Sequence, residues 1–163
     1  MSRYQLAQIN VARLKAPLDS PELKDFVDNL DRINALAESS DGFAWRLTGE
    51  GNDATALRPF GDDVIVNMSV WRDVASLKAF VYQSPHAQIM RRRREWFSRM
   101  DIYMVLWWVT AGHEPTPAEA AARMEHLRQH GPTPEAFTFG EAFSAPDAAQ
   151  PGKPFSFKDA CPA

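Results

Sequence analysis

Hydrophobic and polar positions repeat along this chain with two periods, which separate predicted strands from predicted helices. A repeat of two over residues 4–12, 43–48 and 63–71 predicts three strands. Residues 102–109 (IYMVLWWV) are apolar on both sides, which predicts a fourth strand that is buried on both faces. The alternating aromatics of residues 136–143 indicate a short last strand or an arm.

Apolar residues at helical spacing predict helices between these strands. The expected helices cover residues 20–38, 73–82, 84–97 and 116–131. Ser20 and Ser84 each precede a proline, the pattern of an N-cap followed by proline at the first helical position. Asp73 is expected to cap the second helix, and Thr116 begins a capping box. Gly131 marks the end of the last helix.

The order of these elements, β-α-β-β-α(α)-β-α-β, is that of a ferredoxin-like core, the split β-α-β pattern. It predicts an α+β domain over residues 1–143, in which helices cover one face of an antiparallel sheet. Residues 49–62 are rich in glycine but lack the Lys-Ser/Thr ending of a P-loop, so a plain connector is expected. From about Ser144 the composition shifts to Ala, Pro, Gly and Lys, which predicts a poorly ordered tail over 144–163.

The strand at 102–109 needs cover on both faces. Exposing two or three of its large side chains would cost roughly 1.5–3 kcal/mol each. A second copy of the sheet, packed face to face, would provide the cover, so we expect a homodimer. The alternative is cover by the aromatic residues of the chain's own segment 136–143.

Composition and charge narrow the function classes. The 163 residues are 45% hydrophobic and 24% charged, with a net charge of −3 and a pI near 5.8. These values do not favour nucleic acid or an anionic membrane as a partner. The single cysteine, Cys161, cannot form an intramolecular disulfide. The first residues are too polar for a signal peptide, and the expected location is cytoplasmic.

The stretch 84-SPHAQIMRRRREWF-97 combines a histidine, four arginines and two aromatics. At 100° per residue, one helical stripe collects His86, Met90, Arg93 and Phe97. The same geometry turns the remaining arginines, at positions 91, 92 and 94, mainly outward, onto a solvated face. Because the aromatics lie on the buried stripe, a nucleic-acid surface is not expected.

A small-molecule cavity is the main candidate site. Asn67, Ser69 and Trp71 share one face of the strand 63–71, and the following helices pack back over the sheet. His86 lies in the first turn of its helix, where the helix dipole favours the neutral imidazole. The candidates for catalysis are His86, Asn67, Trp71 and Arg93. The candidates for substrate binding are Asn10, Ser69, Met90 and Phe97.

Plainer interpretations of these residues stay open. His86 could be a hydrogen-bonded histidine of the cap region, Trp71 a core residue, and Asn67 the partner of a strand-end hydrogen bond. His113, His126 and His130 do not have the spacing of a zinc site, and no metal site is expected.

Four segments resemble a bacterial family of unknown function: 67-NMSVWRDVASLKAFVYQSPH-86, 91-RRRREWF-97, 106-LWWVTAGHEPTPAEA-120 and 131-GPTPEAFTF-139. The resemblance spans residues 4–143. In element order the chain is similar to the dimeric α/β-barrel superfamily, which includes the antibiotic-biosynthesis and the haem-degrading monooxygenases. The resemblance implies a barrel formed by two facing sheets, with a pocket between sheet and helices in each subunit.

The resemblance also implies roles for single residues. Cofactor-independent members oxidise aromatics with an asparagine and a tryptophan in the pocket, which Asn67 and Trp71 match best. Haem-degrading members use an asparagine, a tryptophan and a histidine, parts that Asn10, Trp71 and His86 would take. The interval of 15 residues from Trp71 to His86 is longer than that haem pattern, because the short helix 73–82 lies within it.

These observations together predict a small-molecule enzyme that is monooxygenase-like and acts without a bound cofactor. Asn67 or His86 would stabilise a developing oxyanion, and Trp71 would form an apolar wall. Two alternatives stay open: haem binding with His86 as the axial ligand, and a non-catalytic dimer whose pocket sequesters a small molecule.

Overall fold

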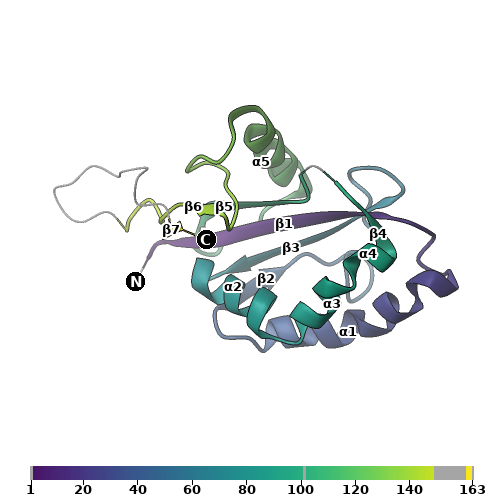
Figure 1. The fold of residues 1–163 in the computed structure, drawn as a ribbon. Helices are drawn as coiled ribbons and strands as arrows, with labels where there is room; N and C mark the ends of the chain where they lie inside the picture. The colour runs from purple at the N-terminus through teal and green to yellow at the C-terminus, as the bar shows by residue number, and fades with distance from the viewer. Residues whose placement is uncertain (1, 101, 149–160, 163) are drawn as a thin grey trace.

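The computed structural model describes residues 2–100, 102–148 and 161–162, which form an α+β fold around an antiparallel sheet (Figure 1). The main sheet consists of β1 (Tyr4–Leu14), β2 (Phe43–Arg46), β3 (Val64–Trp71), β4 (Phe97–Ser98) and β5 (Met104–Thr110). The helices are α1 (Lys24–Glu38), which follows a 3-10 turn at Pro21–Leu23, α2 (Val74–Gln83), α3 (His86–Arg91), α4 (Arg93–Trp96) and α5 (Pro117–His130). Two short strands, β6 (Glu141–Ala142) and β7 (Cys161–Pro162), pair with each other.

Strand β1 is the centre of the sheet. It pairs antiparallel with β3 along one edge and with β5 and then β4 along the other, and β2 extends the sheet beyond β3. The register of β1 against β3 places Gln8 opposite Ser69 and Asn10 opposite Asn67. Four polar residues therefore lie side by side in the middle of the sheet.

The predicted helix starts differ in how they are capped. Asp73 accepts a hydrogen bond from Ser76 N at 2.8 Å, and Thr116 Oγ1 caps α5 as expected. Ser84 Oγ accepts a hydrogen bond from His86 N at 3.2 Å. Ser20 is the N-cap of the 3-10 turn that leads into α1, with Pro21 at its first position as expected, but its hydroxyl donates backward to Pro17 O instead of capping the turn.

Helices cover both faces of the sheet, so the expectation that they lie on one face only is wrong. Helix α5 packs Met124 into the same buried cluster as Trp107 of β5. On the opposite face, Leu77 of α2 packs with Trp71 of β3. Figure 1 shows α5 on one side of the sheet and α1 to α4 on the other. The strand pattern could not predict this, because β5 offers an apolar surface on either face.

Both faces of β5 are covered within one chain. Met124 and Leu127 of α5 pack on the side of Trp107. On the other face, Leu106 packs in one buried cluster with Phe137 and Phe143, and Leu106 and Phe137 also exchange two backbone hydrogen bonds of 2.8 and 2.9 Å along the β5 edge. The argument that β5 needs a second copy of the sheet therefore fails, and the alternative of cover within the chain accounts for its burial. The homodimer and the barrel stay predictions.

The expected continuous helix over 84–97 is broken into two. The backbone at Arg92 leaves helical geometry (φ −92°, ψ 2°), which separates α3 from α4. Phe97 then becomes extended and pairs with Leu14 as part of β4. At this break the Arg92 guanidinium donates to Asp25 and to Glu95, both at 2.8 Å.

The described part of the predicted tail is attached to the domain. Ala145 is buried, and Asp147 accepts hydrogen bonds from Ser2 Oγ and Arg3 N, both at 2.7 Å. The rest of the predicted tail, residues 149–160 and 163, lies outside the described residues. Among the helices of the described chain, each is too short or too polar to cross a lipid bilayer.

Candidate functional site

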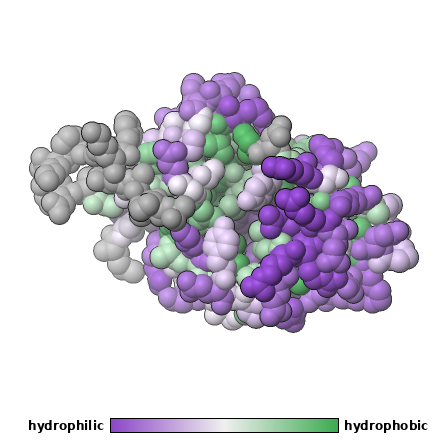
Figure 2. Space-filling model, viewed as in Figure 1, coloured by the Kyte–Doolittle hydropathy of each residue, from purple (hydrophilic) through white to green (hydrophobic). Residues whose placement is uncertain are grey.

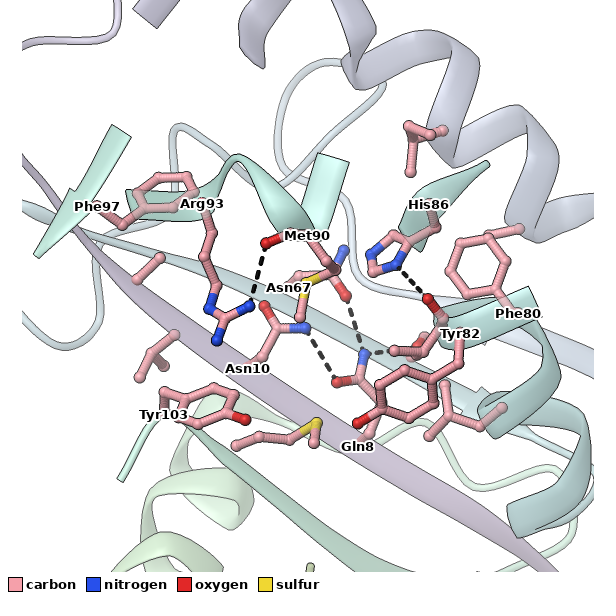
Figure 3. A pocket seen from close by; sticks show the side chains of 18 of the residues that line it. Gln8, Asn10, Asn67, Phe80, Tyr82, His86, Met90, Arg93, Phe97 and Tyr103 are labelled. Carbon is pink, nitrogen blue, oxygen red and sulfur yellow. Dashed lines mark hydrogen bonds between the residues drawn. The ribbon is translucent and has the colours of Figure 1, made fainter. Parts of the chain in front are cut away.

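A cavity of about 490 Å³ lies between the sheet and the helices α1, α2 and α3. Strands β1 and β3 form its floor, and the segment from α2 to β4 forms a large part of its wall (Figure 3). All eight candidate residues line this one cavity: Asn10, Asn67, Ser69, Trp71, His86, Met90, Arg93 and Phe97. The structure thus brings together every residue that the sequence marked for the site.

The floor of the cavity is a connected set of polar side chains. Gln8 Nε2 donates to Asn67 Oδ1 at 2.9 Å and to Ser69 Oγ at 2.7 Å. Asn10 Nδ2 donates to Gln8 Oε1 at 3.3 Å. Gln8 itself is only 3% exposed. Because its oxygen is engaged by Gln8, Asn67 keeps its Nδ2 donors for the solvent-accessible space of the cavity.

Aromatic rings form the wall beside this floor. Trp71 is fully buried and stacks on Phe80, with ring centroids 5.1 Å apart. Its Nε1 donates to Ser69 Oγ at 2.8 Å, which joins the wall to the floor. Phe80 in turn lies 4.9 Å from the ring of His86. The core interpretation of Trp71 is correct as well, since the same side chain packs in the core and lines the cavity.

The imidazole of His86 is held as a neutral ring. Its Nδ1 lies 3.3 Å from Val81 O, and a carbonyl oxygen only accepts, so the proton of the neutral ring is on Nδ1. Burial lowers the pKa of His86, and the hydrogen bond to Val81 opposes that shift in part. In Figure 3 the second ring nitrogen is turned away from Val81 O, toward the side of Met90 and Asn67. Its lone pair is available to accept a proton.

The four arginines of the run have different surroundings. Arg93 lines the cavity and donates to Met90 O at 3.1 Å. Arg94 is exposed, as expected for a solvated face, and the Arg92 side chain is 40% exposed. Arg92 links α1 to α4 through Asp25 and lies 4.9 Å over the ring of Trp96, and Arg94 lines the cavity. The break in the helix at Arg92 changes the direction of the residues after it.

Sequence reasoning missed Asn34, which lines the cavity from α1. The residue is 8% exposed, and its amide reaches the cavity space, because no fully buried side-chain nitrogen or oxygen of the described residues lacks a hydrogen-bond partner. Asn34 also lines an adjoining space of about 140 Å³ under α1, which shares Asn67 and His86 with the main cavity. The signal was present in the sequence, because Asn34 falls among the apolar positions Leu30, Ile33 and Ala37 of its helix.

Gln8, Phe80, Tyr82 and Tyr103 were also missed. Gln8 stands two residues before Asn10 on one face of β1, which is a sequence signal for a polar floor. Tyr82 and Tyr103 are about half exposed at the cavity, and nothing in the pattern of either segment distinguishes them.

The other histidines lie outside the cavity. His113 Nε2 contacts Glu119 Oε1 at 2.7 Å, and the rings of His126 and His130 lie 4.5 Å apart. Across the described residues, no group of three or more His, Cys, Asp or Glu side chains is arranged to hold a metal ion.

Comparison with known proteins identifies a family. Residues 5–153 match the family described as "Domain of unknown function (DUF3291)". Among solved structures, the chain is similar to a protein of unknown function from Nitrosomonas europaea, with 16% identity and a TM-score of 0.44 over 71% of this chain and 96% of the other. A Pseudomonas aeruginosa protein is 14% identical, with a TM-score of 0.47 over 69% and 98% of the two chains. A Chloroflexus aurantiacus protein, provisionally described as an antibiotic biosynthesis monooxygenase, is 17% identical, with a TM-score of 0.42 over 69% and 97%. The comparison with curated proteins finds no match.

Proposed function

Because the chain belongs to the DUF3291 family, whose function is unknown, we infer its activity from the cavity between its sheet and helices. We propose that the protein is an enzyme that acts on a small aromatic molecule bearing a hydroxyl group. The observation that carries this proposal is His86, a neutral imidazole fixed through Nδ1 with its Nε2 free on the cavity side.

The cavity has the size and composition of a small-molecule site. Its volume of about 490 Å³ falls within the range of ~300–1,000 Å³ that is usual for ligand pockets. Phe80, stacked on the buried Trp71, supplies a flat apolar wall, while Gln8, Asn67 and Ser69 supply a fixed set of polar groups. A planar ring with one or two polar substituents fits such a lining, because stacking surfaces and oriented amides lie on adjacent walls.

The chemistry follows from the two kinds of polar group. His86 Nε2 would take the proton of a ligand hydroxyl, as a general base with a pKa below its ordinary value. The amide of Asn67, oriented by Gln8, would donate to the oxyanion that this step creates. The product of the step is an electron-rich phenolate or enolate.

We further propose that this anion reacts with molecular oxygen, as in a monooxygenase that needs no bound cofactor. One oxygen atom would enter the substrate as a carbonyl and the other would leave as water, with both hydrogens of the water drawn from the substrate. For a phenol, the balanced overall change converts the phenol and O₂ into a quinone and water. The residues above would supply the base, the oxyanion donor and the apolar wall.

An oxygen electrode tests the proposal. The purified protein would be incubated with a panel of naphthols and hydroxyanthrones. Mass spectrometry would measure the incorporation of ¹⁸O into products formed under ¹⁸O₂. We expect oxygen uptake that His86→Gln reduces by about 10²-fold or more, whereas Arg91→Gln, outside the cavity, leaves it unchanged. Ligand binding without turnover would overturn the enzyme assignment and favour a protein that only sequesters the ligand.

Haem is a second candidate ligand. An axial histidine usually donates its other ring nitrogen to a carbonyl, and His86 has that arrangement with Val81 O. His86 would hold the iron through Nε2, and the haem would supply oxygen activation. A shift of the Soret band on adding haem, lost in His86→Ala, would support this candidate, and an unshifted spectrum would exclude it.

We also propose a ferredoxin-like core that pairs into a dimeric barrel. The strand order β2-β3-β1-β5 supports the core. Light scattering of the full chain tests the pairing, and a monomer at micromolar concentration would refute it.

A further inference from the structure

The ionisable side chains around the cavity are basic. The lining contains no Asp or Glu among the described residues, but it contains Lys15, Arg46, Arg93, Arg94 and Arg99. This composition contrasts with the whole chain, whose net charge is −3. Figure 2 shows strongly hydrophilic residues gathered over α3, α4 and β4, which form part of the cavity wall.

Most of these cations have no carboxylate partner within the described part of the chain. Arg46 is the exception, because its Nε pairs with Glu38 Oε1 at 2.7 Å. The Lys15 ammonium donates to Arg94 O, a backbone oxygen. Arg93, Arg94 and Arg99 form no ion pair among the described residues. Several like charges around one hollow raise the local concentration of an anion.

The neighbouring arginines show that the uncompensated charge is local to the cavity. Arg92, one residue before Arg93, pairs with Asp25 and Glu95, and it does not line the cavity. In the smaller adjoining space, the Asp53 carboxylate is engaged by Thr55 N and Oγ1. Acidic partners are therefore present nearby but are placed away from the cavity cations.

Arg93 is the cation best placed to bind an acid group. Within the described residues Arg93 makes one hydrogen bond, from Nη1 to Met90 O, which leaves its other guanidinium donors available. Figure 3 shows the guanidinium turned toward Asn10 and on the same side as Tyr103, across the cavity from His86. A planar guanidinium matches the geometry of a carboxylate or phosphate through two parallel hydrogen bonds.

Asn34 adds a polar group to the cavity lining. The residue is 8% exposed, and among the described residues no fully buried side-chain nitrogen or oxygen lacks a hydrogen-bond partner, so its amide reaches the cavity space. The amide is therefore open to polar atoms of a bound molecule.

We propose that the ligand of the cavity is an aromatic acid, whose carboxylate or phosphate binds Arg93 and whose ring lies along the wall formed by Phe80, which Trp71 supports from behind. Its hydroxyl end reaches His86 on the opposite side. The inference rests on the proposed function in one respect, that the cavity binds a small aromatic molecule, and it adds the charge and the orientation of that molecule.

Matched probes test the charge. Isothermal titration calorimetry would compare 6-hydroxy-2-naphthoate with its neutral amide, and 6-hydroxy-2-naphthyl phosphate with naphthalene-2,6-diol. Because hydrogen bonds between charged groups contribute strongly to affinity, we expect the carboxylate, the phosphate or both to bind at least about tenfold more tightly than the neutral partner. The two pairs distinguish a carboxylate ligand from a phosphate ligand. Equal affinities within both pairs, or no binding of any probe, would overturn the inference.

Matched variants test the position of the acid group. Arg93→Gln should bring the ratio of acid to neutral affinity to within about threefold of one. Arg91→Gln changes an exposed arginine of the same helix that does not line the cavity, so it should keep the full ratio. If both variants keep the ratio, Arg93 is not the anchor and the inference fails. The wild-type comparison of probes stands even if a variant misfolds.

The outcomes also separate this inference from the proposed function. Tight binding of the acids without oxygen uptake would sustain the charge preference and refute the enzyme. Oxygen uptake with neutral phenols at the same efficiency as with acids would sustain the enzyme and refute the charge preference.

Discussion

Replacing Gln8 by leucine tests whether the floor of the cavity is held by one side chain. Gln8 lies in the centre of β1 and is almost fully buried. Its amide makes three hydrogen bonds, to Asn67, to Ser69 and from Asn10. Leucine has a similar size and fills the position without any donor or acceptor.

The expected cost follows from the surroundings of each bond. A hydrogen bond contributes about 0.5–1.5 kcal/mol net to stability. Asn67 is exposed and Asn10 half-buried, so water can replace the lost partner and both bonds count near the low end. Ser69 is buried, so its bond counts near the high end, although Ser69 Oγ keeps the hydrogen bond from Trp71 Nε1. The bonds contribute about 2–3 kcal/mol, and burial of the leucine side chain offsets about 1 kcal/mol. We expect a loss of about 1–2 kcal/mol in the free energy of unfolding.

Urea unfolding followed by tryptophan fluorescence measures this loss, provided that the slope with denaturant is unchanged. Gln5→Leu is the matched control on the same strand. The Oε1 of Gln5 accepts one exposed hydrogen bond, from Gly112 N at 3.2 Å, so its replacement should cost at most about 0.5 kcal/mol. A Gln8→Leu protein as stable as the wild type, or a control that loses as much, would refute the reasoning. Gln8→Leu should also weaken binding of the naphthoate probe, because Asn67 loses the contact that orients it.

Three further predictions concern the turn before β2, the histidine and α5. Gly42→Ala and Gly112→Ala both place alanine at positive φ (86° and 88°), at a cost of about 1–2 kcal/mol. Only at Gly42 would the new Cβ lie 2.3 Å from Ser76 Oγ, so its unfolding midpoint in urea should fall further, and equal losses would contradict the packing described. Burial lowers the pKa of His86 from 6.5, so the unfolded chain binds more protons and stability falls as the pH drops from about 6.5 through the lower folded value. His86→Gln should reduce that dependence in urea titrations at pH 7 and pH 5, and an unchanged pH dependence would exclude the mechanism. Met124→Ala, at a residue 6% exposed, should cost about 2–4 kcal/mol in the same assay, whereas a loss under 0.5 kcal/mol would show that α5 does not close the sheet.

The local elements were predictable because each depends on neighbours in sequence. The alternation in 63–71 matches β3, and the box beginning at Thr116 matches the start of α5. The predicted grouping of His86, Met90 and Arg93 on one side of the segment is also found, since all three line the cavity despite the break after α3. Membership in a family of unknown function, expected from four segments, is confirmed.

The features that the sequence did not reveal depend on contacts between segments that are far apart in the sequence. The register of β1 against β3 places Gln8 opposite Ser69, and no local pattern specifies that register. The side on which α5 packs was equally hidden, because β5 is apolar on both faces. The ion pair of Arg92 with Asp25 was not predictable from local pattern, because the two residues are 67 positions apart in the sequence.

The site uses different residues to accept a proton and to bind an anion, because one side chain could not be both neutral and positively charged. His86 is neutral because it is buried, and the main cause of its lowered pKa is desolvation rather than the cavity cations. Arg93 remains exposed, across the cavity, where it can compensate an acid group without protonating the histidine. An aromatic acid bound between them would keep its acid end ionised at Arg93 while its hydroxyl loses a proton at His86. The segment formed by α3 and α4 carries both His86 and Arg93. Arg94, which follows the break at Arg92, lines the same cavity. The interrupted helix therefore contributes a further positive charge to the site.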